Sequence, residues 1–258
     1  NTGDTTGTDY ILNDGELMSG GSYNYMPTNL DSYVYAGTNR IILGKYPAPI
    51  CAYHKKLLGW LSPTECYRLP ASISLSNYSE SNAALDGRAV KARSMLPGEY
   101  WLVENRYYGT GSELNFDRGM WGQGLLIWRV QEEVIGLPDS HWFSQNGINN
   151  NTSRRGIRLE PMQKTAYASR NYTMYAFWSN SAAGFGISTT PSSTYESTGA
   201  QSGVTLSNIS AAGPVMTFNF LSIDFDALAA TNFASFPAPY SLASGDLTMT
   251  FTLPGSGG

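Results

Sequence analysis

The chain has only two histidines and two cysteines, the side chains that most often bind transition metals. A zinc peptidase needs two histidines at i and i+4 on one helical face, with a glutamate between them as general base. His54 and His141 lie far apart, and neither belongs to an H-E-x-x-H motif. The sequence therefore contains no zinc-binding helix of this kind, and His54 is expected to be a surface or hydrogen-bonded residue.

The two cysteines, Cys51 and Cys66, are close in sequence. A short bridged loop suits an oxidising compartment, whereas a metal site would want more ligands nearby. The spacing predicts a Cys51–Cys66 disulfide. Two unpaired, partly buried thiols are the alternative.

Two loops rich in oxygen-bearing side chains, Asn1–Asp14 and Asp139–Asn151, have the residue types that bind calcium. Neither contains a D-x-D-x-D-G run, so calcium sites and simply solvated loops both remain open as interpretations.

The composition favours a secreted, β-rich protein. Only 14% of the 258 residues are charged, while glycine and tyrosine are abundant. The formal net charge is -4 and the basic residues are scattered, which argues against a nucleic-acid partner. No apolar run approaches the roughly 18 residues of a membrane span, and the first residues lack a signal peptide's basic and apolar regions. We expect a mature protein, secreted, extracellular or at the cell surface.

Turn signals divide the chain into short elements. The pattern predicts one short helix over Cys51–Trp60, ended by Pro63, after long irregular N-terminal loops. Strand-length runs with β-branched or aromatic content follow at Tyr67–Leu75, Ala89–Met95, Tyr100–Glu104, Gly124–Val130, Gly156–Met162, Gly203–Ile209 and Pro214–Leu221. The expected fold is α+β, mainly β, with an antiparallel β-rich body and one or two short helices.

Composition changes suggest three regions. Residues 1–66 are loops and the short helix, 67–221 are the β-rich body, and 222–258 are one or two terminal strands and a Pro/Gly linker. The ending Pro254–Gly258 has linker composition, so we expect the natural chain to continue.

Four stretches, in order, resemble the immune-inhibitor-A-like family of secreted zinc metallopeptidases. They are Glu16–Ser22 (ELMSGGS), Tyr53–Pro63 (YHKKLLGWLSP), Glu99–Arg106 (EYWLVENR) with Phe116, Asp117 and Gly122–Val130 (GQGLLIWRV), and Ser202–Phe218. Together they span about residue 10 to residue 220. The sequence departs from the family at His54 and at Gln131-Glu132, where relatives have a serine and an acidic pair.

The resemblance implies roles for particular residues. Met18 would form the apolar floor beneath the zinc, without bonding to it; an ordinary buried methionine is the alternative. Trp60, Glu104, Asn105, Arg106, Asp117 and Trp128 belong to the family motifs and are expected to be structural. Glu104 and Arg106 are two residues apart, so on a strand they share one face and can form a salt bridge.

The resemblance also places the zinc-binding helix just before Asn1. The precursor is cut there and the zinc-bearing fragment stays bound, or this chain is a truncated piece, or the protein never had the zinc helix. On the first two readings it is the C-terminal portion of a peptidase, inactive alone, with zinc only in a bound N-terminal fragment. On the third it is an extracellular surface, filament or adhesive module that binds copies of itself or other partners.

Overall fold

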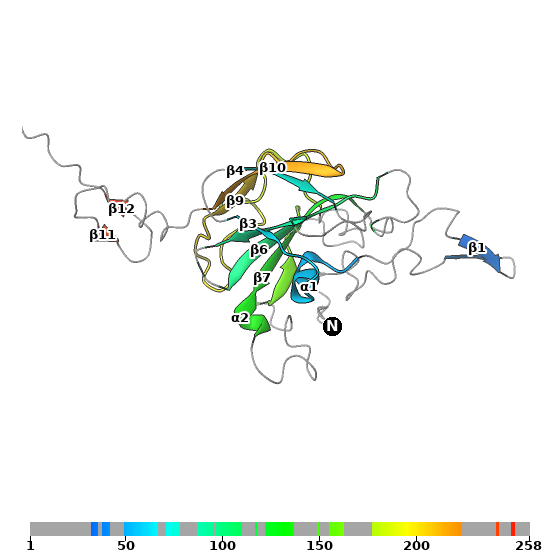
Figure 1. Cartoon of the computed structure of the whole chain (residues 1–258), viewed down its shortest axis with the longest axis horizontal. Coiled ribbons are helices and arrows are strands. Elements are labelled where there is room, and N and C mark those ends of the chain that lie inside the picture. The colour runs from blue at the N-terminus through cyan, green and yellow to red at the C-terminus, as the bar shows by residue number, and fades with distance from the viewer. Residues whose placement is uncertain are drawn as a thin grey trace, which may run out of the picture. The chain divides into compact units, whose positions relative to one another are not determined.

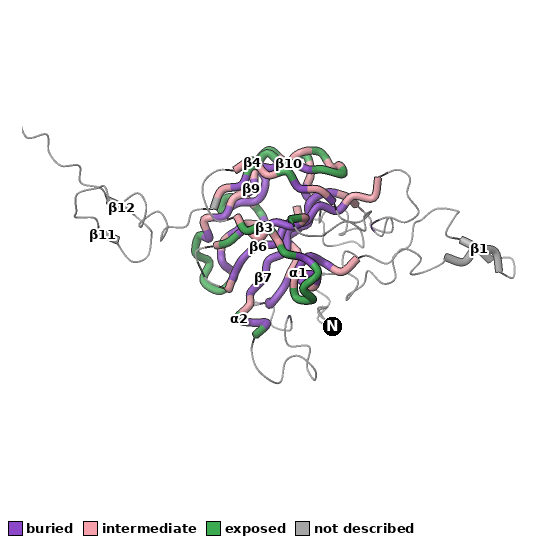
Figure 2. Tube along the Cα trace, viewed as in Figure 1, coloured by how far each residue is buried: buried purple, intermediate pink, exposed green. Residues whose placement is uncertain are grey.

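Two eight-residue strands, β6 (Glu99–Arg106) and β7 (Gly124–Gln131), pair antiparallel along their whole length. Their sequences are rich in aromatic, β-branched and leucine residues, which favour strands. All residues of both strands are buried (Figure 2). Strands covered on both faces read as continuous apolar runs, so this pair requires a layer on each side.

The computed structural model describes residues 32–35, 38–41, 49–66, 71–77, 87–94, 96, 98–109, 117, 122–136, 149, 155–162, 177–222, 241–242 and 249–250. Its larger sheet has the order β3 (Thr64–Cys66), β5 (Ala89–Arg93), β6, β7, β8 (Ile157–Leu159) and is antiparallel except between β3 and β5. A second, antiparallel sheet has the order β4 (Ala71–Ser76), β10 (Val215–Ser222), β9 (Val204–Ser207) (Figure 1).

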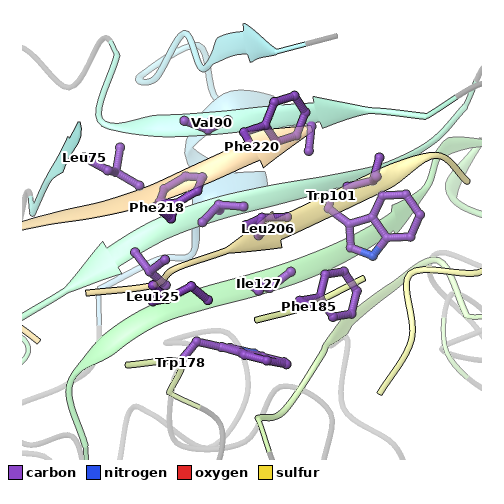
Figure 3. Close-up of a cluster of buried hydrophobic side chains, with 14 of the residues drawn as sticks. Leu75, Val90, Trp101, Leu125, Ile127, Trp178, Phe185, Leu206, Phe218 and Phe220 are labelled. Carbon is purple, nitrogen blue, oxygen red and sulfur yellow. The ribbon is translucent and has the colours of Figure 1, made fainter. Parts of the chain in front are cut away.

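The two faces of the larger sheet carry separate cores. Helix α1 (Ala52–Leu57) packs on what we call the helix face, where its buried residues meet Tyr100, Leu102 and Trp128. The smaller sheet packs on the opposite face, called the sandwich face. Figure 3 shows this second core, with Phe218 and Leu206 of the smaller sheet beside Trp101 and Ile127.

Short elements complete the described structure. Helix α2 (Glu132–Ile135) follows β7 directly, and β1 (Ser32–Tyr35) pairs with β2 (Thr38–Ile41). Strands β11 (Ser241–Leu242) and β12 (Met249–Thr250) form a two-stranded sheet of their own. The chain divides into two units, Asn1–Ile223 and Asp224–Gly258, and β11 and β12 belong to the second. Among the described residues, no helix has the length and apolar character needed to cross a membrane.

The predicted α+β, mainly β fold with its antiparallel body is confirmed, but the end of the helix has a different cause from the one expected. Gly59 has φ 72°. The Trp60 N–H donates to the Lys55 carbonyl and the Gly59 N–H to the Lys56 carbonyl. This pair of bonds is the Schellman motif that ends helices at a glycine. Gly59, rather than Pro63, therefore ends α1.

The backbone at Gly184 lies very close to β9. A Cβ atom at Gly184 would lie 1.9 Å from the Leu206 carbonyl oxygen, and Phe185 exchanges backbone hydrogen bonds with Leu206. Gly184→Ala should lower the free energy of unfolding by several kcal/mol, because a positive φ costs about 1–2 kcal/mol and the backbone clash adds a further 1–3 kcal/mol or so. Urea denaturation measures this loss.

Gly199 supplies the matched control. Its φ of 71° resembles the 66° of Gly184, but no atom lies within 4 Å of the added Cβ. Gly199→Ala should therefore show only the conformational cost. Equal losses for the two variants would contradict the close approach.

Candidate functional site

The family-motif residues at the end of β6 form a buried ion-pair cluster on the helix face. Arg106 donates from Nε to Asp117 at 2.8 Å and from a terminal nitrogen to Glu104 at 3.2 Å. The Trp128 indole N–H donates to the same Glu104 oxygen at 2.7 Å. We call Glu104, Arg106, Asp117 and Trp128 the Arg106 cluster. None of its side chains is more than 1% exposed.

Lys55 of α1 adds a fourth charge beside this cluster. Its side chain is buried, and burial together with Arg106 lowers its pKa to about 8, against the opposing effect of Glu104 and Asp117. Burial raises the pKa of Glu104, although Arg106 and Lys55 oppose the shift. The cost of burying these charges is therefore only partly offset by their attraction.

Asn105, between Glu104 and Arg106 on β6, points to the sandwich face and connects the larger sheet to the smaller one. Its side-chain amide donates to the carbonyls of Leu75 at 3.1 Å, Gly213 at 3.0 Å and Pro214 at 3.4 Å. These acceptors belong to β4 and the approach to β10. Asn105 thus fastens the larger sheet to the smaller one, whereas its neighbours Glu104 and Arg106 pair with each other on the helix face, and all three side chains are buried.

A second buried ion-pair cluster lies on the sandwich face, and the sequence analysis missed it. Arg129 donates to Glu160 at 2.6 Å and to Glu99 at 3.2 Å. It also donates to the Thr194 carbonyl at 2.7 Å and the Ser192 carbonyl at 3.0 Å. The sequence feature that could have revealed this cluster is the single arginine inside the apolar run GLLIWRVQ, because a charge buried in such a strand must be paired.

The same cluster continues to the segment before β9. Arg158 bonds to Glu160 at 2.8 Å and to Glu196, and Gln131 donates to Glu196 at 2.9 Å. We call Glu99, Arg129, Arg158, Glu160 and Glu196 the Arg129 cluster. Arg129 bonds to the Ser192 and Thr194 carbonyls, and Arg158 and Gln131 bond to Glu196. These contacts hold the irregular segment around residues 192–196 against the larger sheet.

No disulfide joins Cys51 to Cys66 in the structure, so the predicted Cys51–Cys66 bond is not formed. The physical reason is their placement: Cys51 belongs to the core of the helix face, whereas Cys66 packs against the core of the sandwich face. The sheet separates the two thiols. Cys51 instead lies 3.4 Å from Nδ1 of His54.

Three large apolar side chains are exposed at the end of α1. Leu57 is 58%, Leu58 52% and Trp60 56% exposed. We call these three residues the α1 patch, and Figure 2 shows exposed residues at this helix. Lys56 fixes the helix beside the patch, because its amine bonds to Glu132 of α2 at 3.1 Å and to the Tyr100 hydroxyl at 3.1 Å.

Several predicted site residues lie outside the described part of the chain. These are Met18, the loop Asn1–Asp14, and the loop Asp139–Asn151 except for Asn149. Asn149 is buried and its side-chain oxygen accepts a hydrogen bond from the Ile157 N–H at 3.2 Å. Within the described residues, no three His, Cys, Asp or Glu side chains lie together as a metal site. This part of the chain therefore offers no fit for a zinc ion.

Comparison with protein-family models, with curated proteins and with solved structures finds no match to this chain.

Removing Arg106 should destabilise the protein strongly. Arg106→Met leaves Glu104 and Asp117 buried without their main counter-charge, and breaking such a pair costs about 3–5 kcal/mol. Arg93→Met is the matched control, because Arg93 is 47% exposed and lies 4.0 Å from Glu65. An exposed pair contributes under about 1 kcal/mol. Chemical denaturation of both variants measures the difference, and similar losses would show that the Arg106 cluster is not a structural requirement.

Lys55 should make stability rise with pH in alkaline solution. The folded-state pKa of about 8 lies below the ordinary 10.5, so between these values the unfolded chain still binds a proton that the folded chain has released. Over this range the unfolding free energy of the wild type, measured relative to Lys55→Met, should increase by up to about 3 kcal/mol. Urea titrations at several pH values measure it, and a constant difference would contradict the shifted pKa.

Proposed function

We propose that this chain is the supporting, C-terminal portion of a secreted zinc metallopeptidase similar to the immune-inhibitor-A-like family. It does not catalyse a reaction alone. The zinc ion and the general base are supplied by a separate N-terminal fragment of the same precursor. This chain supplies the supporting framework, including the sheet beneath α1.

One observation carries the proposal. In the strands β6 and β7 of the most recognisable stretch of the resemblance, every charged side chain is buried: Glu99, Glu104, Arg106 and Arg129 are at most 6% exposed. They bond to other groups within this chain. A motif of this kind builds a framework, which is the role that the peptidase resemblance gives to this half of the molecule.

The α1 patch is the proposed docking surface for the zinc-bearing fragment. Single exposed apolar residues are ordinary on a protein surface, but three large ones within four residues favour an interaction site. The helix beneath them is held by Lys56 and by the Schellman bonds at Gly59, so the patch is presented on a fixed support. Its position in Tyr53–Pro63, one of the stretches of resemblance, supports an occupant from the same precursor.

A different function is favoured by one other feature: β4, an outer strand of the smaller sheet, pairs with a strand on one side only among the residues that the structure describes. A chain that never had a zinc helix could act as a self-associating extracellular module, and an unpaired strand edge suits that role. Such a module would need neither zinc nor a second fragment.

Intact mass spectrometry of the natural material under denaturing conditions, with zinc quantified on the native sample, tests the proposal. We expect two chains, one of which carries H-E-x-x-H, and about one zinc ion per complex, as a catalytic site binds. A single chain without zinc would overturn the peptidase proposal and leave the self-associating module.

Substitution in the α1 patch of the precursor separates docking from folding. Leu58→Ser with Trp60→Ser should release the zinc-bearing fragment during native purification, while the unfolding midpoint of this chain changes little because both side chains are exposed. Val215→Ser is the matched control, since Val215 is 50% exposed but lies on β10 of the smaller sheet. Retention of the fragment by the patch variant would place its binding elsewhere.

A further inference from the structure

Most strand edges in the described structure are short or covered. The outer strands of the larger sheet, β3 and β8, have three residues each. The outer side of β9 is covered, because Leu206 exchanges backbone hydrogen bonds with Phe185 and the Asn208 N–H donates to the Ala182 carbonyl. Natural proteins blunt exposed edges in such ways, since an open edge offers unpaired backbone groups to another strand.

Strand β4 is the exception. It has six residues and pairs with β10 on one side, and no strand among the described residues pairs with its other side. Its sequence, ASISLS, contains no charge, no proline and no glycine. The residue types that usually protect a long edge are therefore missing from its sequence.

The outward backbone groups of β4 can be assigned to particular residues. The Asn77 N–H donates to the Pro214 carbonyl on the β10 side, continuing the register in which Ser76 faces Val215. Residues two apart on an antiparallel strand point their backbone groups the same way, so Leu75 and Ile73 also face β10. The N–H and C=O groups of Ser72, Ser74 and Ser76 consequently point away from the sheet.

We propose that β4 pairs with β4 of a second copy of this chain, antiparallel, about a two-fold axis at Ser74. Each copy would contribute three strands to a continuous six-stranded sheet. The pairing places Ser74 opposite Ser74 and Ser72 opposite Ser76 of the other copy. It places Ile73 opposite Leu75 on the side of the apolar cores.

The residue pattern favours a second copy over an unrelated strand. In the two-fold arrangement hydroxyl side chains face hydroxyl side chains, and apolar side chains face apolar ones. Ile73 is only partly buried in one copy, so the approach of a second strand would cover it further. A two-fold interface must be self-complementary in this way.

Charge also permits the approach of two copies. The side chains on the outer face of the smaller sheet are all uncharged: Ser72, Ser74, Ser76, Thr205, Ser207, Val215, Thr217, Asn219 and Leu221. No like charges therefore meet across the axis. A single paired edge buries less surface than a stable dimer usually does, so the association is weak and depends on concentration. This inference does not rest on the peptidase proposal, because it holds for the chain with or without a zinc-bearing fragment.

Disulfide trapping tests the register. In a hydrogen-bonded antiparallel pair the two Cα atoms lie about 5.5 Å apart, which a disulfide can span. Ser74→Cys should therefore form a covalent dimer under mild oxidation of the full chain. In Ser72→Cys the two introduced thiols would sit about 14 Å apart across the axis and should not bond. The wild type, which contains Cys51 and Cys66, measures the background of cross-linking through these native thiols.

A mixture of Ser72→Cys and Ser76→Cys supplies the positive counterpart. These positions face each other in the proposed register, so the mixture should cross-link although Ser72→Cys alone does not. Equal cross-linking by Ser74→Cys and Ser72→Cys, or none above the wild-type background, would overturn the proposed pairing.

Sedimentation measures the association without a covalent bond. The wild-type mass should rise from 28.1 kDa toward twice that value as concentration increases. Ser74→Lys should remain monomeric, because two ammonium groups would meet at the axis. An equimolar mixture of Ser74→Lys and Ser74→Glu should recover the dimer. Thr217→Lys is the matched control, since Thr217 is exposed beside Ser74 but on the inner strand β10, and it should behave as the wild type. A monomeric wild type throughout the series would refute the inference.

Discussion

The antiparallel pairing of β6 with β7, covered on both faces, is the constraint on which the other layers depend. Any charged side chain on these strands loses its water, and must find a partner inside the protein. Arg106 meets that need on the helix face through Glu104 and Asp117. Arg129 meets it on the sandwich face through Glu99, Glu160 and the carbonyls of the segment before β9. The two arginines therefore restrict which neighbouring segments can pack on the central strands. A segment without the matching acceptors would leave an arginine buried and unpaired, which is strongly destabilising.

This constraint separates the framework from the surfaces that meet partners. The residues that carry the most recognisable part of the resemblance lie inside, whereas the α1 patch and the β4 edge lie outside. Helix α1 covers the helix face of the larger sheet, and β4 belongs to the sheet on the sandwich face. A zinc-bearing fragment on α1 and a second copy on β4 would therefore occupy different layers of the same unit. The two proposals do not compete for one surface, and each can fail without the other.

Turn chemistry and strand composition were enough to predict the antiparallel body, because each of the seven expected runs was bounded by glycine, proline or polar residues. Strands β1 and β2 escaped prediction because they lie in the N-terminal region that was expected to be irregular. Strand β3 escaped it because its three residues, Thr64–Cys66, are too few to show a pattern and pair in parallel with β5. The disulfide was expected from the short sequence separation and the expected oxidising compartment, and neither contains information about the face on which a cysteine lies. The Glu104–Arg106 contact follows from strand alternation, but the partners of Arg129 come from distant segments. Sequence pattern could show that Arg129 needs acceptors and could not show which.

Glu160 of the Arg129 cluster and Glu104 of the Arg106 cluster differ in how far neighbouring charges compensate their burial. Burial alone would raise the pKa of Glu160, but Arg129 and Arg158 together lower it below its ordinary value. Burial prevails at Glu104, whose pKa is raised although Arg106 and Lys55 oppose the shift. The stabilisation from Glu160 is therefore present above its unfolded pKa and lost as pH falls through its folded pKa, whereas that from Glu104 follows the opposite course. As pH falls, Glu104 therefore binds its proton before Glu160 does, and the ion pairs of Glu160 with Arg129 and Arg158 persist to lower pH.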